Sequence, residues 1–142
     1  MKLTTEDIVE EWEKDCEITP DIVNETRSIP LMHHKYYVRL IKVKRALREL
    51  TEELEVLEFK KRLYYSGQAT PEEYKAKPFN HRVIKSELPI WLRADEDIRK
   101  TKKRKEILDE MKEVLEETVR QINVRNFLIK NIIEYRKFEA GG

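Results

Sequence analysis

The feature that most constrains the fold is a long stretch, residues 31–65, that contains neither glycine nor proline. A helix of that length would extend roughly 50 Å at about 1.5 Å per residue, farther than one small globular core can cover. Its apolar side chains recur at alternating steps of four and three residues, which indicates a heptad seam that packs against another long helix of the same or another chain. The seam comprises Tyr36, Leu40, Val43, Leu47, Leu50, Leu54 and Leu57, and its continuation predicts Lys61 and Tyr64.

A second long helix is expected from about residue 95 to residue 138. The chain is 40% charged and has only 3 glycines and 5 prolines, which is typical of long, solvated helices. These features predict an all-α fold in which two long antiparallel helices, residues 31–66 and 95–139, pair through their seams. So large a charged fraction leaves little apolar material for a monomeric core, so self-association is expected. The second seam comprises Leu108, Met111, Leu115, Thr118, Ile122, Ile129 and Ile132, with Arg125 as a polar exception.

Shorter elements are expected outside these helices, all within one helical domain of residues 1–142. In residues 1–29, Thr4 or Thr5 can cap a short helix that ends near Cys16, and Thr19-Pro20 begins a second short helix. Ser28-Ile29-Pro30 is expected to break the chain before the first long helix.

Residues 67–94 are expected to form an irregular connector between the long helices. Gly67 supplies a stop for the preceding helix. Thr70-Pro71 and the two glutamates that follow read as a capping box on a short helical turn. Residues 79–94 are interrupted by Pro89 and are expected to be irregular, with room for a short extended piece.

Charge is distributed unevenly along the chain. Residues 1–25 contain nine acids and two lysines, so this segment carries −7 and the remainder carries +8. An acidic start on a basic body suggests two surfaces with different partners. A solvated helix face that is simply acidic is an equally good interpretation.

No pattern in the sequence favours catalysis. It lacks a P-loop, a glycine-rich phosphate cradle, a Gly-x-Ser-x-Gly turn and zinc-type Cys/His spacing. His33 and His34 are adjacent and would point about 100° apart on a helix, so they cannot readily hold one metal ion. We therefore expect no enzyme activity, no metal and no cofactor. The single cysteine, Cys16, and the lack of an apolar leader or membrane-length run predict a soluble protein of a reducing intracellular compartment.

Basic clusters are the strongest functional signal. His33–Arg48 contains six cations and no acid, Glu49–Glu58 contains five acids, and Arg99–Lys105 contains six cations in seven residues. Cations at this density usually meet phosphate groups, through contacts that are salt-sensitive and independent of base sequence. The alternative is pairing with acids on the facing helix, as at the flanks of coiled coils. The candidate phosphate contacts in these two basic runs are Lys42, Lys44, Arg45, Arg99, Lys102, Lys103 and Arg104.

A further basic cluster, FKKRLYYSG at residues 59–67, places aromatic rings beside cations. Cationic side chains can follow a nucleic acid backbone while unpaired bases stack on tyrosine, an arrangement suited to single strands. Lys60, Lys61 and Arg62 are therefore candidate phosphate ligands, and Tyr64 or Tyr65 is a candidate stacking platform. The alternative is that Tyr64 fills the seam and Tyr65 packs near the turn.

Several blocks in a fixed order carry a family resemblance. They are Glu10-Glu11-x-x-Lys14-Asp15, Tyr64-Tyr65-Ser66-Gly67, Lys85-Ser86-Glu87 with Leu92-x-Ala94-Asp95-x-Asp97, and a tail of Arg125-x-Phe127-x-Ile129-Lys130-x-Ile132 with Arg136-x-Phe138-Glu139-Ala140-Gly141. In these blocks the chain resembles the recombination mediator proteins of T4-like phages, the UvsY family. It departs from the family pattern where Lys60-Lys61-Arg62-Leu63 stands in place of Lys-Ala-Arg-Leu-Asp, and little similarity is found between about Arg99 and Asn123.

The resemblance implies a homo-oligomeric ring of six or seven helical subunits that binds single-stranded DNA. Such mediators help to displace the phage single-strand binding protein and load the RecA-like recombinase onto the strand, in phage recombination, replication and repair. They act in the cytoplasm of the infected bacterial host. A coiled-coil scaffold whose partners are proteins only remains the alternative. The family's C-terminal region is associated with oligomerisation, which would place at subunit contacts Phe127, Ile129, Ile132, Ile133 and Phe138.

Overall fold

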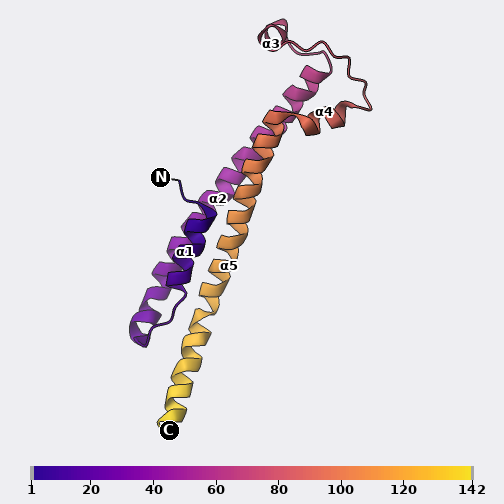
Figure 1. The fold of residues 1–142 in the computed structure, drawn as a ribbon. Coiled ribbons are helices and arrows are strands. Elements are labelled where there is room, and N and C mark those ends of the chain that lie inside the picture. Colours follow the sequence, from indigo (N-terminus) through magenta and orange to yellow (C-terminus); the bar gives the residue numbers. More distant parts are fainter. Residues whose placement is uncertain (1, 142) are drawn as a thin grey trace. The chain divides into compact units, whose positions relative to one another are not determined.

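The computed structural model describes residues 2–141, which form helices and no strand. Figure 1 shows the elements in chain order. This confirms the all-α prediction and the presence of two long helices. Within residues 2–141 no helix contains an apolar stretch long enough to cross a lipid bilayer. The helices are α1 (Thr5–Asp15), α2 (Ile22–Tyr65), α3 (Pro71–Ala76), α4 (Leu88–Ala94) and α5 (Glu96–Glu139).

The chain divides into two compact units, and both long helices contribute to each of them. Unit 1 comprises Met1–Arg45 and Leu108–Gly142, so it holds α1, the first half of α2 and most of α5. Unit 2 is Ala46–Ile107, which holds the end of α2, the two short helices and the start of α5. The interpretation of residues 1–142 as a single domain stays a prediction.

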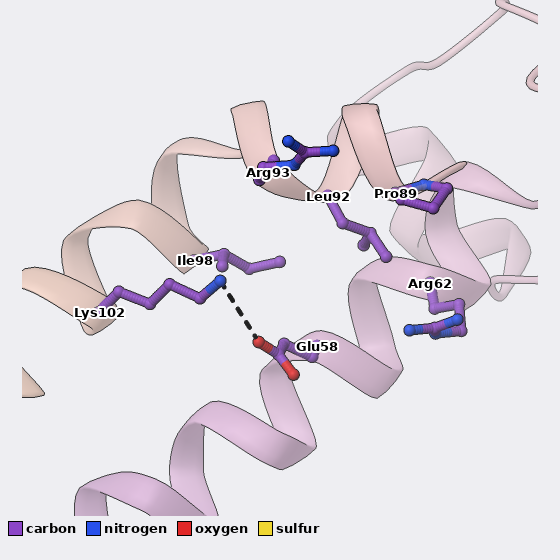
Figure 2. A pocket seen from close by; sticks show the side chains of 7 residues that line it. All are labelled: Glu58, Arg62, Pro89, Leu92, Arg93, Ile98 and Lys102. Atoms are coloured by element: carbon purple, nitrogen blue, oxygen red, sulfur yellow. Dashed lines mark ion pairs between the residues drawn. The ribbon is translucent and has the colours of Figure 1, made fainter. Parts of the chain in front are cut away.

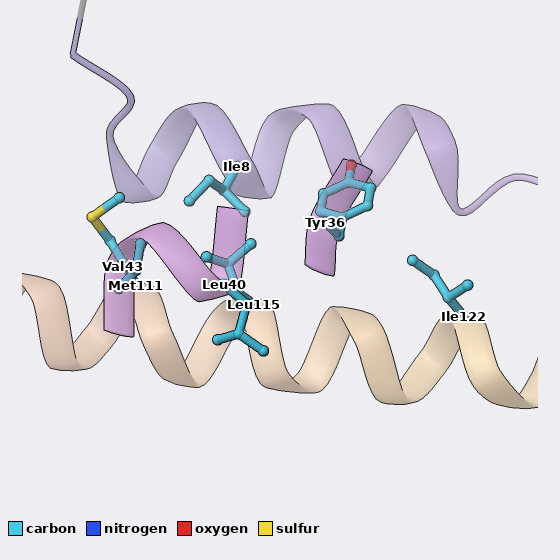
Figure 3. Packing of buried hydrophobic residues seen from close by; sticks show 7 residues of the cluster. All are labelled: Ile8, Tyr36, Leu40, Val43, Met111, Leu115 and Ile122. Carbon is cyan, nitrogen blue, oxygen red and sulfur yellow. The ribbon is translucent and has the colours of Figure 1, made fainter. Parts of the chain in front are cut away.

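Three helices build the core of unit 1 (Figure 3). Ile8 comes from α1, and seam residues of α2 and α5 pack against it. Trp12 of α1 meets the ring of Tyr36 edge-on, with 5.6 Å between ring centroids. The buried residues follow the predicted three-and-four spacing on both long helices, which confirms the two seams. The core residues of the long helices are Tyr36, Leu40, Val43, Met111, Leu115 and Ile122.

The acidic helix α1 is held against α2 by charge as well as by apolar packing. Thr4 caps α1 in a capping box with Asp7, as expected. Lys35 binds both Glu11 (3.0 Å) and Asp15, and Arg39 binds Glu11 at 2.5 Å. Two of the six cations in His33–Arg48 are therefore neutralised by the acidic start of the same chain.

The expected break at Ser28-Ile29-Pro30 is wrong, because α2 continues through Pro30. Proline lacks the N–H that would bond the carbonyl four residues earlier, and its ring crowds that carbonyl. Pro30 lies on the exposed surface, where water can reach the freed carbonyl of Thr26. Ile29 and Met32 pack against the core, so tertiary packing keeps the helix continuous. The second short helix expected from Thr19-Pro20 is therefore wrong as well, because the residues from Ile22 onward form the first turns of α2.

Arg125, the polar exception in the second seam, is buried in unit 1 with only 3% of its side chain exposed. Its Nη2 atom lies 2.6 Å from Oε2 of Glu25. Its guanidinium also donates to the carbonyls of Cys16 (3.1 Å) and Glu17 (2.8 Å), two residues of the link between α1 and α2. Burial alone would raise the pKa of Glu25, but hydrogen bonds from Arg125 and Thr19 lower that pKa below its ordinary value.

In unit 2, Gly67 ends α2 in the left-handed conformation with φ of 78°. Thr70 caps α3 by accepting a hydrogen bond from the backbone N–H of Glu73, which is one half of the predicted capping box. The prediction that residues 79–94 are irregular throughout is wrong, because Leu88–Ala94 forms α4. Pro89 lies in its first turn, where the missing N–H has no helical partner in any case.

Candidate nucleic-acid interface

The three cations before the Tyr-Tyr pair have different roles in unit 2. Lys61 lies at a seam position, and its side chain is only 13% exposed. Its Nζ atom is 2.7 Å from Oδ2 of Asp97 and 3.2 Å from Oδ2 of Asp95. Lys60 and Arg62 are exposed, and neither forms an ion pair with any described residue. Of these three candidate phosphate ligands, the fold therefore leaves Lys60 and Arg62 accessible.

Asp95 is the centre of the contacts around Lys61. Its Oδ1 accepts the backbone N–H of Ile98 (3.0 Å) and so caps α5, while its Oδ2 accepts the hydroxyl of Tyr65 (2.6 Å). Burial raises the pKa of Asp95, but the hydrogen bonds from Tyr65, Ile98 and Lys61 together lower it below the ordinary value. Burial and the bond to Asp95 raise the pKa of the Tyr65 hydroxyl. These contacts join the end of α2 to the start of α5.

The Tyr-Tyr pair lies in an aromatic cluster of unit 2. Tyr64 is buried, stacks on Tyr74 with 5.4 Å between centroids, and donates its hydroxyl to the carbonyl of Lys77. Tyr65 meets Phe79 edge-on and also contacts Trp91. Both rings of the candidate stacking platform thus pack against other rings of the same unit.

Cations of Arg99–Lys105 meet the acids of Glu49–Glu58 across unit 2. Lys102 lies 3.9 Å from Glu58, and Arg104 lies 3.8 Å from Glu53. About half or more of each cationic side chain is exposed, so these long contacts stabilise little and open readily. Arg99 and Lys103 are exposed and pair with no described residue.

A cavity of about 180 Å³ brings together two of the predicted basic stretches in unit 2 (Figure 2). Arg62 comes from the end of α2 and Lys102 from the first turns of α5. A third cation, Arg93 of α4, completes the set. Three positive side chains and one carboxylate, that of Glu58, therefore surround one hollow, whose apolar lining is Pro89, Leu92 and Ile98.

The sequence analysis does not identify Arg93, because it predicts an irregular segment where α4 forms. The signal was present: a proline in the first turn of a helix is favourable, and no glycine occurs between residues 88 and 94. The pairing of Lys61 with Asp95 and Asp97 could not be read from the sequence, because these residues lie on different helices.

The other candidate cations lie in unit 1. Lys42, Lys44 and Arg45 are on exposed positions of α2, and none of them pairs with a described residue. Within residues 2–141, no three His, Cys, Asp or Glu side chains gather in a group that could hold a metal ion.

The tail residues expected at subunit contacts fall into two groups. Ile129 is buried in this chain and Ile132 is half-buried. Phe127, Ile133 and Phe138 are exposed, at 61%, 37% and 78%. Leu128 and Tyr135, which the prediction omitted, are also exposed. The end of α5 therefore presents several large apolar side chains that unit 1 does not cover.

Comparison with known proteins agrees with this fold. Residues 11–142 match the family described as "Recombination, repair and ssDNA binding protein UvsY". A crystal structure of the bacteriophage T4 recombination mediator protein UvsY, lattice type II, is 26% identical, covers 99% of this chain and 98% of that chain, and has a TM-score of 0.85. The lattice type I structure of the same T4 protein is 24% identical, covers 94% and 98% of the two chains, and has a TM-score of 0.84. No curated protein sequence matches the chain. Because the family match spans most of its length, the chain belongs to the UvsY family.

Proposed function

We propose that this protein is a recombination mediator that binds single-stranded DNA, displaces the single-strand binding protein and loads a RecA-like recombinase onto the strand. Its setting is phage recombination, replication and repair in the cytoplasm of the infected host. Support comes from the family, described by recombination, repair and single-stranded DNA binding, and from the similar T4 mediator. The family is one of non-enzymatic mediators. The observation that carries the proposal is that Lys60 and Arg62, beside Tyr-Tyr-Ser-Gly, stay exposed and form no ion pair with residues 2–141.

The strand-binding surface combines Lys60 and Arg62 with other accessible cations of unit 2. Arg99 and Lys103 have no ion pair within the described residues, and Lys102 and Arg104 hold theirs at 3.8–3.9 Å. A phosphate can displace such loose, solvated contacts, because an exposed pair is worth about 0–1 kcal/mol. Release of counterions from the strand then drives binding. In unit 1, Lys42, Lys44 and Arg45 are further contacts.

Assembly into a ring of six or seven subunits would multiply these contacts. The exposed apolar side chains at the end of α5 support self-association, since a contiguous apolar surface on a protein typically marks an interaction site. Once one subunit holds a strand, binding to the next subunit is intramolecular, and modest contacts combine into high affinity. A strand held along such a ring could be presented to the recombinase while the competing protein dissociates.

Reversing two charges tests the strand-binding surface. The Lys60→Glu/Arg62→Glu variant should bind a labelled oligonucleotide at least about tenfold more weakly. The slope of log K against the logarithm of the salt concentration should also decrease in magnitude by about two. Fluorescence anisotropy over a range of salt concentrations measures both quantities. Lys61 is left intact, because its removal would also break the contacts with Asp95 and Asp97.

The matched control is Lys2→Glu/Lys14→Glu, which changes net charge equally within the acidic N-terminal segment. It should leave the affinity and salt dependence nearly unchanged. If the two variants behave alike, Lys60 and Arg62 are not part of the interface. If wild-type protein binds no oligonucleotide even at low salt, the protein is a coiled-coil scaffold instead, with the acids of Glu49–Glu58 neutralising Arg99–Lys105.

Substitutions at the end of α5 test assembly. The Phe127→Ser/Phe138→Ser variant should form smaller species than wild type by light scattering, because it removes two large exposed apolar surfaces. Helicity by circular dichroism should stay constant, since neither side chain is buried within the chain. Val23→Ser/Val56→Ser, which also changes exposed apolar residues but lies outside the tail, should keep the wild-type mass. An unchanged mass for the tail variant would remove the end of α5 from the subunit contact.

A further inference from the structure

The cavity of unit 2 has the composition of a binding site for a charged ligand with an apolar part. Pro89, Leu92 and Ile98 give it an apolar lining, and Figure 2 shows the side chains of Leu92 and Ile98 directed into the space between the helices. Arg62 and Arg93 lie at its edge, and both are exposed. Ligand sites typically combine such an apolar lining with a few well-placed polar groups.

The charge at the cavity favours an anion. Arg62, Arg93 and Lys102 outnumber the one carboxylate, Glu58. Glu58 is partly neutralised by Lys102 at 3.9 Å, the contact drawn in Figure 2. The two arginines have no ion pair within the described residues. Their guanidinium groups can therefore donate to phosphate oxygens in the bidentate geometry that arginine favours.

The size of the cavity limits the ligand. At about 180 Å³ it is smaller than the roughly 300–1,000 Å³ of sites for drug-sized molecules. A whole nucleotide cofactor would exceed it, but a single planar base fits a space of this order. A base presents flat apolar faces to aliphatic side chains, and its neighbouring phosphates remain outside, at the level of the arginines.

The side of the cavity that Ile98 forms is held in place before any ligand binds. Asp95 lies between Arg93 and Ile98 in the chain. Its carboxylate accepts a hydrogen bond from the backbone N–H of Ile98, and it also binds the side chains of Tyr65 and Lys61 of α2. Ile98 itself is only 1% exposed. A preformed site avoids the entropic cost of ordering its side chains on binding.

We propose that this cavity holds one unpaired base of a bound single strand, with the base against Leu92 and Ile98. Arg62 and Arg93 bind the phosphates on either side of that base. Lys102 leaves Glu58 for the strand when it binds. Contacts of this kind do not depend on base identity, which suits a protein that must bind any sequence. The inference rests on the proposed binding of single-stranded DNA and assigns a role to Arg93 and Leu92.

Oligonucleotides with and without bases test the inference on the full-length protein. One probe is a labelled oligothymidylate, and the other is a strand of the same length built from abasic tetrahydrofuran units, which keeps the phosphates. Wild-type protein should bind the first about tenfold more tightly. Leu92→Trp, whose indole would fill the cavity, should bring the ratio of affinities close to one while keeping the salt dependence. Arg93→Ala should weaken both probes and reduce the salt dependence by about one phosphate contact.

Arg82→Ala is the matched control, because Arg82 is an exposed cation of the same unit that does not line the cavity. It should retain the wild-type ratio and salt dependence. Circular dichroism shows whether Leu92→Trp folds; if it does not, the comparison of Arg93→Ala with Arg82→Ala decides. A wild-type ratio retained by folded Leu92→Trp, or equal behaviour of the two arginine variants, would overturn the base site and leave strand binding intact. Failure of wild-type protein to bind either probe would overturn both proposals.

Discussion

Replacing Arg125 by alanine should lower the free energy of unfolding of unit 1 by about 3–5 kcal/mol, because it leaves the buried carboxylate of Glu25 without its cation. The same change removes two hydrogen bonds to the carbonyls of Cys16 and Glu17. Urea unfolding followed by the fluorescence of Trp12 measures the effect, in a Trp91→Phe background and at a fixed protein concentration. Trp12 is a suitable probe because it packs on Tyr36 in the core of unit 1.

Two further variants separate the ion pair from a general effect of losing an arginine. Arg120→Ala removes an exposed cation that binds Glu117 on the same helix, and it should leave the unfolding curve unchanged. The double variant Glu25→Leu/Arg125→Leu should be more stable than Arg125→Ala, since replacing both charges leaves no unpaired ion. A loss below about 1 kcal/mol for Arg125→Ala would show that water reaches Glu25 and that the pair is not a structural element.

Replacing Asp95 by alanine should destabilise unit 2 by about 2–4 kcal/mol. The change removes the cap of α5, which typically costs about 0.5–2 kcal/mol. It also leaves the partly buried hydroxyl of Tyr65 without its acceptor, which adds about 1–2 kcal/mol, the lower part of the range for a polar group that loses its partner. The fluorescence of Trp91 in a Trp12→Phe background reports on this unit, because Trp91 contacts Tyr65 and Phe79.

The matched control is Asp97→Ala, which removes the other carboxylate bound by Lys61. Asp97 is 55% exposed, so its loss should cost less than about 1 kcal/mol. Asp95→Asn should fall between the two, because its amide oxygen can still cap α5. Equal effects of Asp95→Ala and Asp97→Ala would mean that stability depends on a carboxylate paired with Lys61, and that the hydrogen bonds specific to Asp95 contribute nothing. Oligonucleotide affinities of the same variants would show whether binding at the cavity requires the first turn of α5 to be held rigidly.

The seams show which part of the fold could be read from the sequence. The three-and-four spacing of Tyr36, Leu40 and Val43, and of Met111 and Leu115, is a local property of each helix, and all five side chains are buried as predicted. Capping by Thr4 and the helix stop at Gly67 also follow from the chemistry of residues a few positions apart.

The prolines show where local rules failed. Pro30 has an unfavourable position for a helix, yet packing of Ile29 and Met32 keeps α2 continuous. The sequence pattern predicts an interruption at Pro89, although Pro89 occupies the first turn of α4, where proline is favourable. In both cases the outcome depended on contacts and position within the fold, and the residue type alone did not settle it.

The candidate site was predicted as a set of cations beside a pair of tyrosines. The sequence indicated clusters of positive charge, but it does not distinguish the roles of the adjacent cations Lys60, Lys61 and Arg62. Their different roles arise because the helical period places Lys61 toward Asp95 and Asp97 and leaves its two neighbours exposed. Likewise, Tyr64 and Tyr65 became members of an aromatic cluster whose other rings lie 10 or more residues away.

The sequence by itself determined the two long helices, their seams and the clusters of basic residues, because each depends on spacing within one segment. Only the tertiary structure decided which charges remain available. Ion pairs form between groups brought together from distant parts of the chain, and a cation that finds a carboxylate in a buried position is no longer accessible to a phosphate. The folded chain therefore removed Lys35, Arg39 and Lys61 from the accessible set and placed Arg93 at the same cavity as Arg62.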